Sequence, residues 1–157
     1  MYGYTINHDI AMRSEFPRST SGQSSLDVLF IDDSINLCRA MELWLTSSGY
    51  SALTATTAAE AEGIAILRHP RVIITDIGLP DGSGYELRRK LLETGGMDAT
   101  HFIALSGSRG KTASRQAIES GFETFIAKPP DFNELAAVLR ERLPGSRPDS
   151  GARPSLK

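Results

Sequence analysis

Short apolar runs alternate with helical patterns through the middle of the chain. Most of the runs are continuously apolar, as strands of a parallel sheet covered on both faces must be. The five predicted strands are Val28–Ile31, Tyr50–Ala55, Val72–Ile74, Phe102–Leu105 and Thr124–Ala127. The second run is rich in Ser and Thr, so we expect it at an edge of the sheet.

A helix is predicted after each strand. The helical patterns begin near Ser34, Thr57, Ser83, Lys111 and Asp131. The second and third open with capping boxes, in which a Ser or Thr is followed three residues later by Glu. Five strand–helix units in succession predict an α/β fold, with an open parallel sheet between two layers of helices.

Composition changes at both ends of this region. Residues 1–25 are polar and aperiodic, and residues 144–157 contain three Pro, three Ser and two Gly. Such segments are typical of linkers and tails. We therefore predict one folded domain over residues 26–143, with a flexible extension before it and a flexible tail after it.

Charge and composition restrict the partners. The 157 residues include 17 basic and 19 acidic side chains, which give a formal net charge of −2. This charge provides no field to attract nucleic acid or an anionic membrane, so neither is expected as a partner. No apolar run approaches the length of a membrane span or a signal peptide core. A lone cysteine, Cys38, fits a reducing compartment, and we expect a cytoplasmic protein.

Chemically active side chains follow four of the five predicted strands. They are Asp32 and Asp33, Asp76, Ser106, and Lys128. The carboxyl ends of parallel strands share one edge of a sheet, where α/β proteins bind their ligands. An isolated Asp after a strand is usually a helix N-cap, and an isolated Lys is usually solvated. Those separate explanations do not account for all four positions together.

Three carboxylates at one edge repel one another unless a cation lies between them. Mg²⁺ prefers oxygen ligands and uses one or two carboxylates together with a phosphate oxygen. With Asp32 and Asp33 holding this ion, Asp76 is free to attack phosphorus. The resulting acyl phosphate could bind the ammonium of Lys128 and the hydroxyl of Ser106 through its terminal oxygens.

These residues resemble the receiver domain of two-component response regulators. The matching motifs are Asp32-Asp33, the run Asp76–Gly82, Ser106-Gly107, and the run Phe125–Pro129. Each motif alone is weak, but their order and spacing match across the whole of residues 26–143. The resemblance implies a flavodoxin-like sheet of five strands in the order 2-1-3-4-5, with five helices.

The resemblance also implies roles for individual residues. Asp76 would be the phosphoacceptor, and Asp32, Asp33 and the backbone carbonyl of Gly78 would join it in binding Mg²⁺. Ser106 would be the switch hydroxyl, Lys128 the invariant-type lysine, and Phe125 the switch aromatic. A cis peptide bond before Pro129 is implied as well.

The implied function is signal transduction by phosphorelay. The domain would accept a phosphoryl group from a histidine kinase or phosphotransfer protein and then change its surface toward an unknown downstream protein. It would be no enzyme in the ordinary sense, although it would assist its own phosphorylation and dephosphorylation. Gly78 has no side chain beside the phosphoacceptor, which should leave the phosphoryl group accessible to water.

Three other interpretations remain. Because no output module follows Leu143, we expect a stand-alone regulator, and a receiver module excised from a hybrid histidine kinase is the alternative. A haloacid-dehalogenase-type phosphatase would need a second Asp where Gly78 stands. A degenerate receiver would lack some of the chemical residues, and here all are present. Gly82 and Gly84 lie before the third helix without forming a glycine-rich nucleotide motif.

Overall fold

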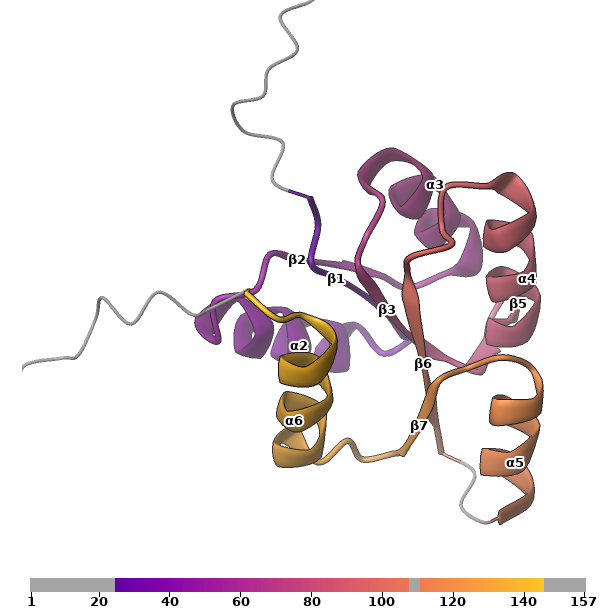
Figure 1. The fold of residues 1–157 in the computed structure, drawn as a ribbon. Helices are drawn as coiled ribbons and strands as arrows, with labels where there is room; N and C mark the ends of the chain where they lie inside the picture. The colour runs from indigo at the N-terminus through magenta and orange to yellow at the C-terminus, as the bar shows by residue number, and fades with distance from the viewer. Residues whose placement is uncertain (1–24, 108–110, 146–157) are drawn as a thin grey trace, which may run out of the picture.

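A five-stranded parallel sheet forms the centre of the protein (Figure 1). The computed structural model describes residues 25–107 and 111–145, so nearly all of the predicted extension and tail lies outside the described residues. The strands are β1 (Val28–Ile31), β2 (Ala52–Ala55), β3 (Val72–Asp76), β6 (His101–Ser106) and β7 (Thr124–Ala127). Their order, β2-β1-β3-β6-β7, confirms the predicted flavodoxin-like sheet and places β2 at an edge.

Five helices cover the two faces of this sheet (Figure 1). They are α2 (Ile35–Ser47), α3 (Ala58–Arg68), α4 (Gly84–Thr94), α5 (Lys111–Glu119) and α6 (Phe132–Arg142). Helices α2 and α6 pack on one face, and α3, α4 and α5 pack on the other. The predicted caps of α3 and α4 form, because the Thr57 and Ser83 side chains accept hydrogen bonds from backbone amides three residues later.

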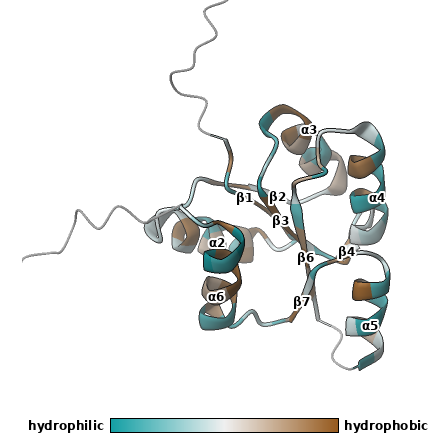
Figure 2. Ribbon diagram, viewed as in Figure 1, coloured by the Kyte–Doolittle hydropathy of each residue, from teal (hydrophilic) through white to brown (hydrophobic). Residues whose placement is uncertain are grey.

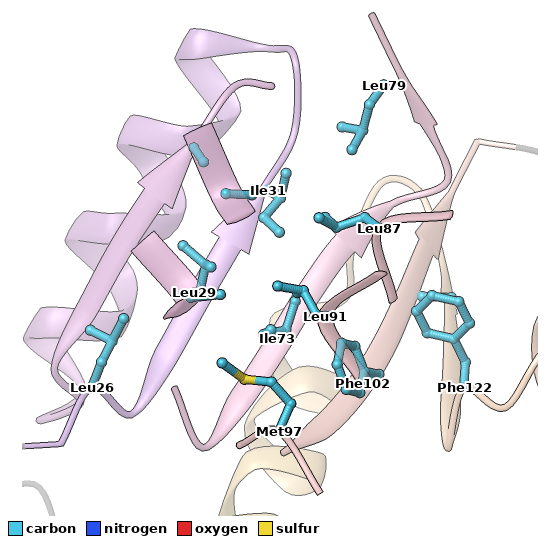
Figure 3. Close-up of a cluster of buried hydrophobic side chains, with 14 of the residues drawn as sticks. Leu26, Leu29, Ile31, Ile73, Leu79, Leu87, Leu91, Met97, Phe102 and Phe122 are labelled. Atoms are coloured by element: carbon cyan, nitrogen blue, oxygen red, sulfur yellow. The ribbon is translucent and has the colours of Figure 1, made fainter. Parts of the chain in front are cut away.

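Successive residues of a strand point alternately into two separate hydrophobic cores, one on each face of the sheet. Leu29 and Ile31 of β1 point into the core under α3 and α4, part of which Figure 3 shows, while Val28 and Phe30 point toward α2 and α6. Burial on both faces explains why β1 is apolar at every position. The helices, in contrast, carry both hydrophobic and hydrophilic residues, as Figure 2 shows. None of the helices in the described part of the chain is long and apolar enough to cross a membrane.

The connection between Asp76 and α4 contains an element that was not predicted. Strand β4 (Gly78–Leu79) pairs with β5 (Gly82–Ser83) in a small antiparallel hairpin. Strands of two residues carry no periodic pattern, so the sequence offers no signal for them. Strand β3 also extends two residues beyond the predicted apolar run and ends on Asp76 itself. The hairpin therefore closes the loop that begins at the candidate phosphoacceptor.

Candidate functional site

The structure brings the predicted chemical groups to one edge of the sheet. Asp32 directly follows β1, Asp76 ends β3, Ser106 ends β6, and Lys128 directly follows β7. These four strands are consecutive neighbours in the sheet. Parallel pairing places their carboxyl ends side by side, as the sequence argument required.

Lys128 lies between two carboxylates. Its Nζ is 2.8 Å from Asp76 Oδ2 and also forms an ion pair with Asp32 Oδ2. Burial on its own would lower the pKa of Lys128, but the contacts with Asp32 and Asp76 outweigh burial, and the pKa is raised. The ammonium is therefore charged at neutral pH and offsets part of the negative charge of the two carboxylates.

Asp76 is held by backbone contacts as well as by Lys128. Its Oδ1 accepts a hydrogen bond from the amide of Gly78 at 3.2 Å, and its backbone carbonyl accepts one from Thr75 Oγ1 at 2.9 Å. The amide of Ile77 donates to the Leu105 carbonyl at 3.1 Å, which joins the chain beyond β3 to the neighbouring strand β6. These contacts fix the position of a side chain that is 12% exposed.

The three aspartates form a cluster suited to a hard cation. Asp32, Asp33 and Asp76 each offer a carboxylate oxygen, and these oxygens lie within 4.8 Å of one another. The amide of Ser34 donates to Asp32 Oδ1 at 2.8 Å and fixes the orientation of this buried side chain. An all-oxygen donor set with one exposed member, Asp33, matches the preference of Mg²⁺ for carboxylates and water. The residues present therefore fit the predicted ion.

Ser106 and the candidate switch aromatic Phe125 share one face of the sheet. Ala104 pairs with Phe125 and Ser106 pairs with Ala127, so all four side chains of this parallel pair project to the same side. Ser106 is buried, and Phe125 is half-buried against the core under α3 and α4. The two residues are therefore diagonal neighbours on adjacent strands.

Cys38 lies beside the cluster without taking part in its chemistry. Its thiol donates to the backbone carbonyl of Asp32 at 3.2 Å, and the side chain is 3% exposed. Burial raises the pKa of the Cys38 thiol, so it is neutral and not nucleophilic at pH 7. Cys38 belongs to the core between α2, α6 and the sheet. The peptide bond between Lys128 and Pro129 is cis, as the resemblance implied.

A groove of about 430 Å³ opens beside the cluster between the beginnings of α2 and α6. Its lining consists of Asp32, Asp33, Ser34, Leu37, Lys128, Pro129 and Pro130. The side chains of Ile35 and Phe132, at the first residues of these helices, are 58% and 43% exposed. A larger groove, of about 520 Å³ near α4, includes none of the clustered residues. The chemistry of the aspartates, and not groove size, identifies the site.

Asp81 has a structural role that sequence analysis missed. From the turn between β4 and β5, its carboxylate accepts hydrogen bonds from the amides of Ala58 at 2.7 Å and Ala59 at 3.0 Å. These amides belong to the first turn of α3, where backbone donors lack helical partners. Asp81 therefore links the loop after the candidate phosphoacceptor to α3. Because its partners are 22 and 23 residues away, no local pattern could reveal the contact.

This contact predicts a pH-dependent stability. The amides of Ala58 and Ala59 lower the pKa of the Asp81 carboxyl from its ordinary value of 3.8. A lowered pKa contributes stability that is present above 3.8 and is lost as the pH falls through the folded-state pKa. We expect Asp81→Asn to lower the melting temperature at pH 7, with the difference from wild type disappearing in acid. Thermal unfolding followed by circular dichroism tests this, and a difference that grows on acidification would contradict it.

Comparison with known proteins identifies relatives of this chain. The response regulator receiver domain model matches residues 28–140. Transcriptional regulatory protein KdpE of Mycobacterium tuberculosis H37Rv is 36% identical over 113 residues, which cover 72% of this chain and 49% of KdpE. The chain thus spans about half of that relative.

Solved structures share the fold. Chemotaxis protein CheY4 of Vibrio cholerae superposes with a TM-score of 0.70 at 24% identity, over 76% of this chain and 100% of CheY4. A response regulator from Burkholderia pseudomallei gives a TM-score of 0.65 at 25% identity, over 72% of this chain and 65% of the other. That protein was solved with a phosphorylated aspartic acid, a calcium ion and citrate. With its receiver fold and the match over residues 28–140, the chain belongs to the response regulator receiver domain family.

Proposed function

We propose that Asp76 accepts a phosphoryl group from a phosphohistidine of a histidine kinase or phosphotransfer protein. The observation that carries this proposal is the position of the Asp76 carboxylate, which contacts the Lys128 ammonium and lies within 4.8 Å of carboxylate oxygens of Asp32 and Asp33. The phosphorylated aspartic acid of the Burkholderia response regulator supports the same chemistry. Receiver domains act in signalling as phosphoacceptors and not as ordinary enzymes.

The proposed step is an in-line displacement at phosphorus. A bond forms between a carboxylate oxygen of Asp76 and the phosphorus atom as the P–N bond to the donor histidine breaks. The electron pair of that bond stays on the imidazole, which leaves neutral because its other nitrogen carries a proton. Lys128 would hold an oxygen of the transferred group, a role that its 2.8 Å contact between Nζ and Asp76 Oδ2 supports.

Asp32, Asp33 and Asp76 would hold Mg²⁺ through carboxylate oxygens, and we propose the backbone carbonyl of Gly78 as a further ligand. The bound ion would neutralise charge on the oxygens of the transferred phosphoryl group. Gly78 is exposed, and a β-carbon there would meet no heavy atom of the described residues within 4 Å. Water can therefore approach, and we propose that the domain assists its own dephosphorylation.

The groove between α2 and α6 is the proposed approach route for the donor. Ile35 and Phe132, the first residues of α2 and α6, are exposed apolar side chains, while Asp32 and Lys128 line the groove. Protein interfaces commonly combine an apolar contact area with a few buried polar groups. We propose that the exchange occurs in the cytoplasm and that the phosphorylated domain then contacts a downstream protein. The same chemistry serves a stand-alone regulator and a module of a larger protein.

Phosphorylation by a small donor tests the proposal directly. Incubation with acetyl phosphate and Mg²⁺ is expected to add one phosphoryl group to the wild-type protein, measured by intact-protein mass spectrometry. Asp76→Asn removes the nucleophile and is expected to abolish the addition, whereas Asp98→Asn removes an exposed carboxylate elsewhere and should leave it unchanged. Labelling of Asp76→Asn at the wild-type rate would refute the assignment.

A further inference from the structure

Gly84 begins helix α4 and touches the end of strand β3. Its amide donates to the Ile77 carbonyl at 2.9 Å, which closes the loop that starts at Asp76. The backbone of Gly84 is outside the positive-φ region, so an alanine could adopt its conformation without strain. The reason for a glycine must therefore be sought in the space around position 84.

That space is filled by the backbone of the candidate phosphoacceptor. A β-carbon at position 84 would lie 2.7 Å from the carbonyl oxygen of Asp76, 3.2 Å from Ile77 Cα and 3.3 Å from Thr75 Cγ2. Carbon and oxygen atoms ordinarily approach to about 3.3 Å, so an added methyl requires a displacement of about 0.6 Å. The nearest two atoms belong to the main chain and cannot turn away as a flexible side chain can.

Two other glycines, one in the same loop and one in a helix, do not share this constraint. A β-carbon at Gly82 would have its nearest neighbour at 3.5 Å, and that neighbour is the end of the Glu86 side chain. At Gly63, in the middle of α3, a β-carbon would meet no heavy atom of the described chain within 4 Å. These two positions therefore provide matched controls for adding a methyl group, in the same loop and in a helix.

We infer that Gly84 is a positioning residue for Asp76, an inference that rests on the proposed function. The absence of a side chain lets α4 pack directly against the Asp76 carbonyl. That carbonyl also accepts a hydrogen bond from the Thr75 hydroxyl. The Asp76 carboxylate is held at 2.8 Å from Lys128 Nζ and at 3.2 Å from the Gly78 amide nitrogen. A methyl at position 84 moves the carboxylate relative to these contacts, and misplacing a reacting group by less than 1 Å is enough to slow a reaction.

The experiment compares Gly84→Ala with Gly82→Ala and Gly63→Ala in the full chain. Phosphorylation by acetyl phosphate and Mg²⁺ is expected to slow about tenfold or more in Gly84→Ala, while the two controls stay near the wild-type rate. Amide chemical shifts of Asp76, Ile77 and Lys128, measured by NMR without phosphorylation, are expected to change in Gly84→Ala alone. Circular dichroism verifies that each variant is folded.

The two readouts separate the inference from the proposed function. If wild type is phosphorylated on Asp76 and Gly84→Ala reacts equally fast, the inference is wrong and the function stands. If wild type is not phosphorylated, the proposed function fails, and the amide shifts alone decide whether Gly84 positions Asp76. Unchanged shifts, or a Gly84→Ala variant that does not fold while Gly84→Ser folds and reacts at the wild-type rate, would also overturn the inference.

Discussion

Phosphorylation of Asp76 by acetyl phosphate is expected to fall about a hundredfold when EDTA removes divalent metal, or when Asp32 and Asp33 are both replaced by Asn. The oxygens of Asp32, Asp33 and Asp76 lie within 4.8 Å of one another, and in the described part of the chain Lys128 is the cation that contacts two of these carboxylates. An incoming phosphoryl group adds further negative charge. The single ammonium of Lys128 does not offset this total, so we expect the reaction to need a divalent ion.

Rate and metal affinity should change together in this experiment. The double variant is expected to lose Mn²⁺ binding, measured by electron paramagnetic resonance, as well as phosphorylation, measured by mass spectrometry. A matched variant with Asp98→Asn and Glu119→Gln removes the same charge from exposed positions and should retain both properties. Because Asp32 is buried, thermal unfolding must show that the double variant is folded. Rapid labelling of wild type in EDTA would refute the metal requirement.

The sequence predicted the sheet because burial on both faces leaves a simple pattern. Strands β1 and β3 contribute to both cores, so neither can place polar residues on alternate positions. The order of the strands then determined which groups meet. Asp32, Asp76 and Lys128 are up to 96 residues apart in sequence, yet each stands at the carboxyl end of a strand. Topology alone therefore placed them at one edge.

Contacts between separate segments of the chain could not be predicted from local sequence patterns. The bonds from Asp81 to the amides of α3 join segments whose separate sequences indicate only a turn and a helix start. The sequence shows Gly84 as a loop glycine, but only the structure shows that a β-carbon at this position would meet the Asp76 carbonyl oxygen. The β4–β5 hairpin was missed for a similar reason, because two paired residues on each side give no period. These features depend on contacts between segments, and local sequence patterns do not show which segments meet.

Ser106→Ala is expected to uncouple phosphorylation from the conformational change around Phe125. We propose that a phosphoryl oxygen on Asp76 attracts the Ser106 hydroxyl, through a charged hydrogen bond of about 1.5–3 kcal/mol. Ser106 and Phe125 project from adjacent strands on the same face of the sheet, so movement of the hydroxyl can open space for the ring. Turning a half-buried aromatic ring inward contributes a comparable free energy.

A coupling of this size shifts a two-state equilibrium about ten- to a hundredfold, which suffices for a switch. NMR spectra with and without beryllofluoride, a mimic of the phosphoryl group, measure that shift. In wild type, beryllofluoride should move the resonances of Phe125 and of α5, whose Ala117 packs in the same core. Ser106→Ala should bind the mimic but show little of this movement, while Ser106→Thr, which keeps the hydroxyl, should restore it. Full wild-type shifts in Ser106→Ala would mean that the signal reaches Phe125 by another route.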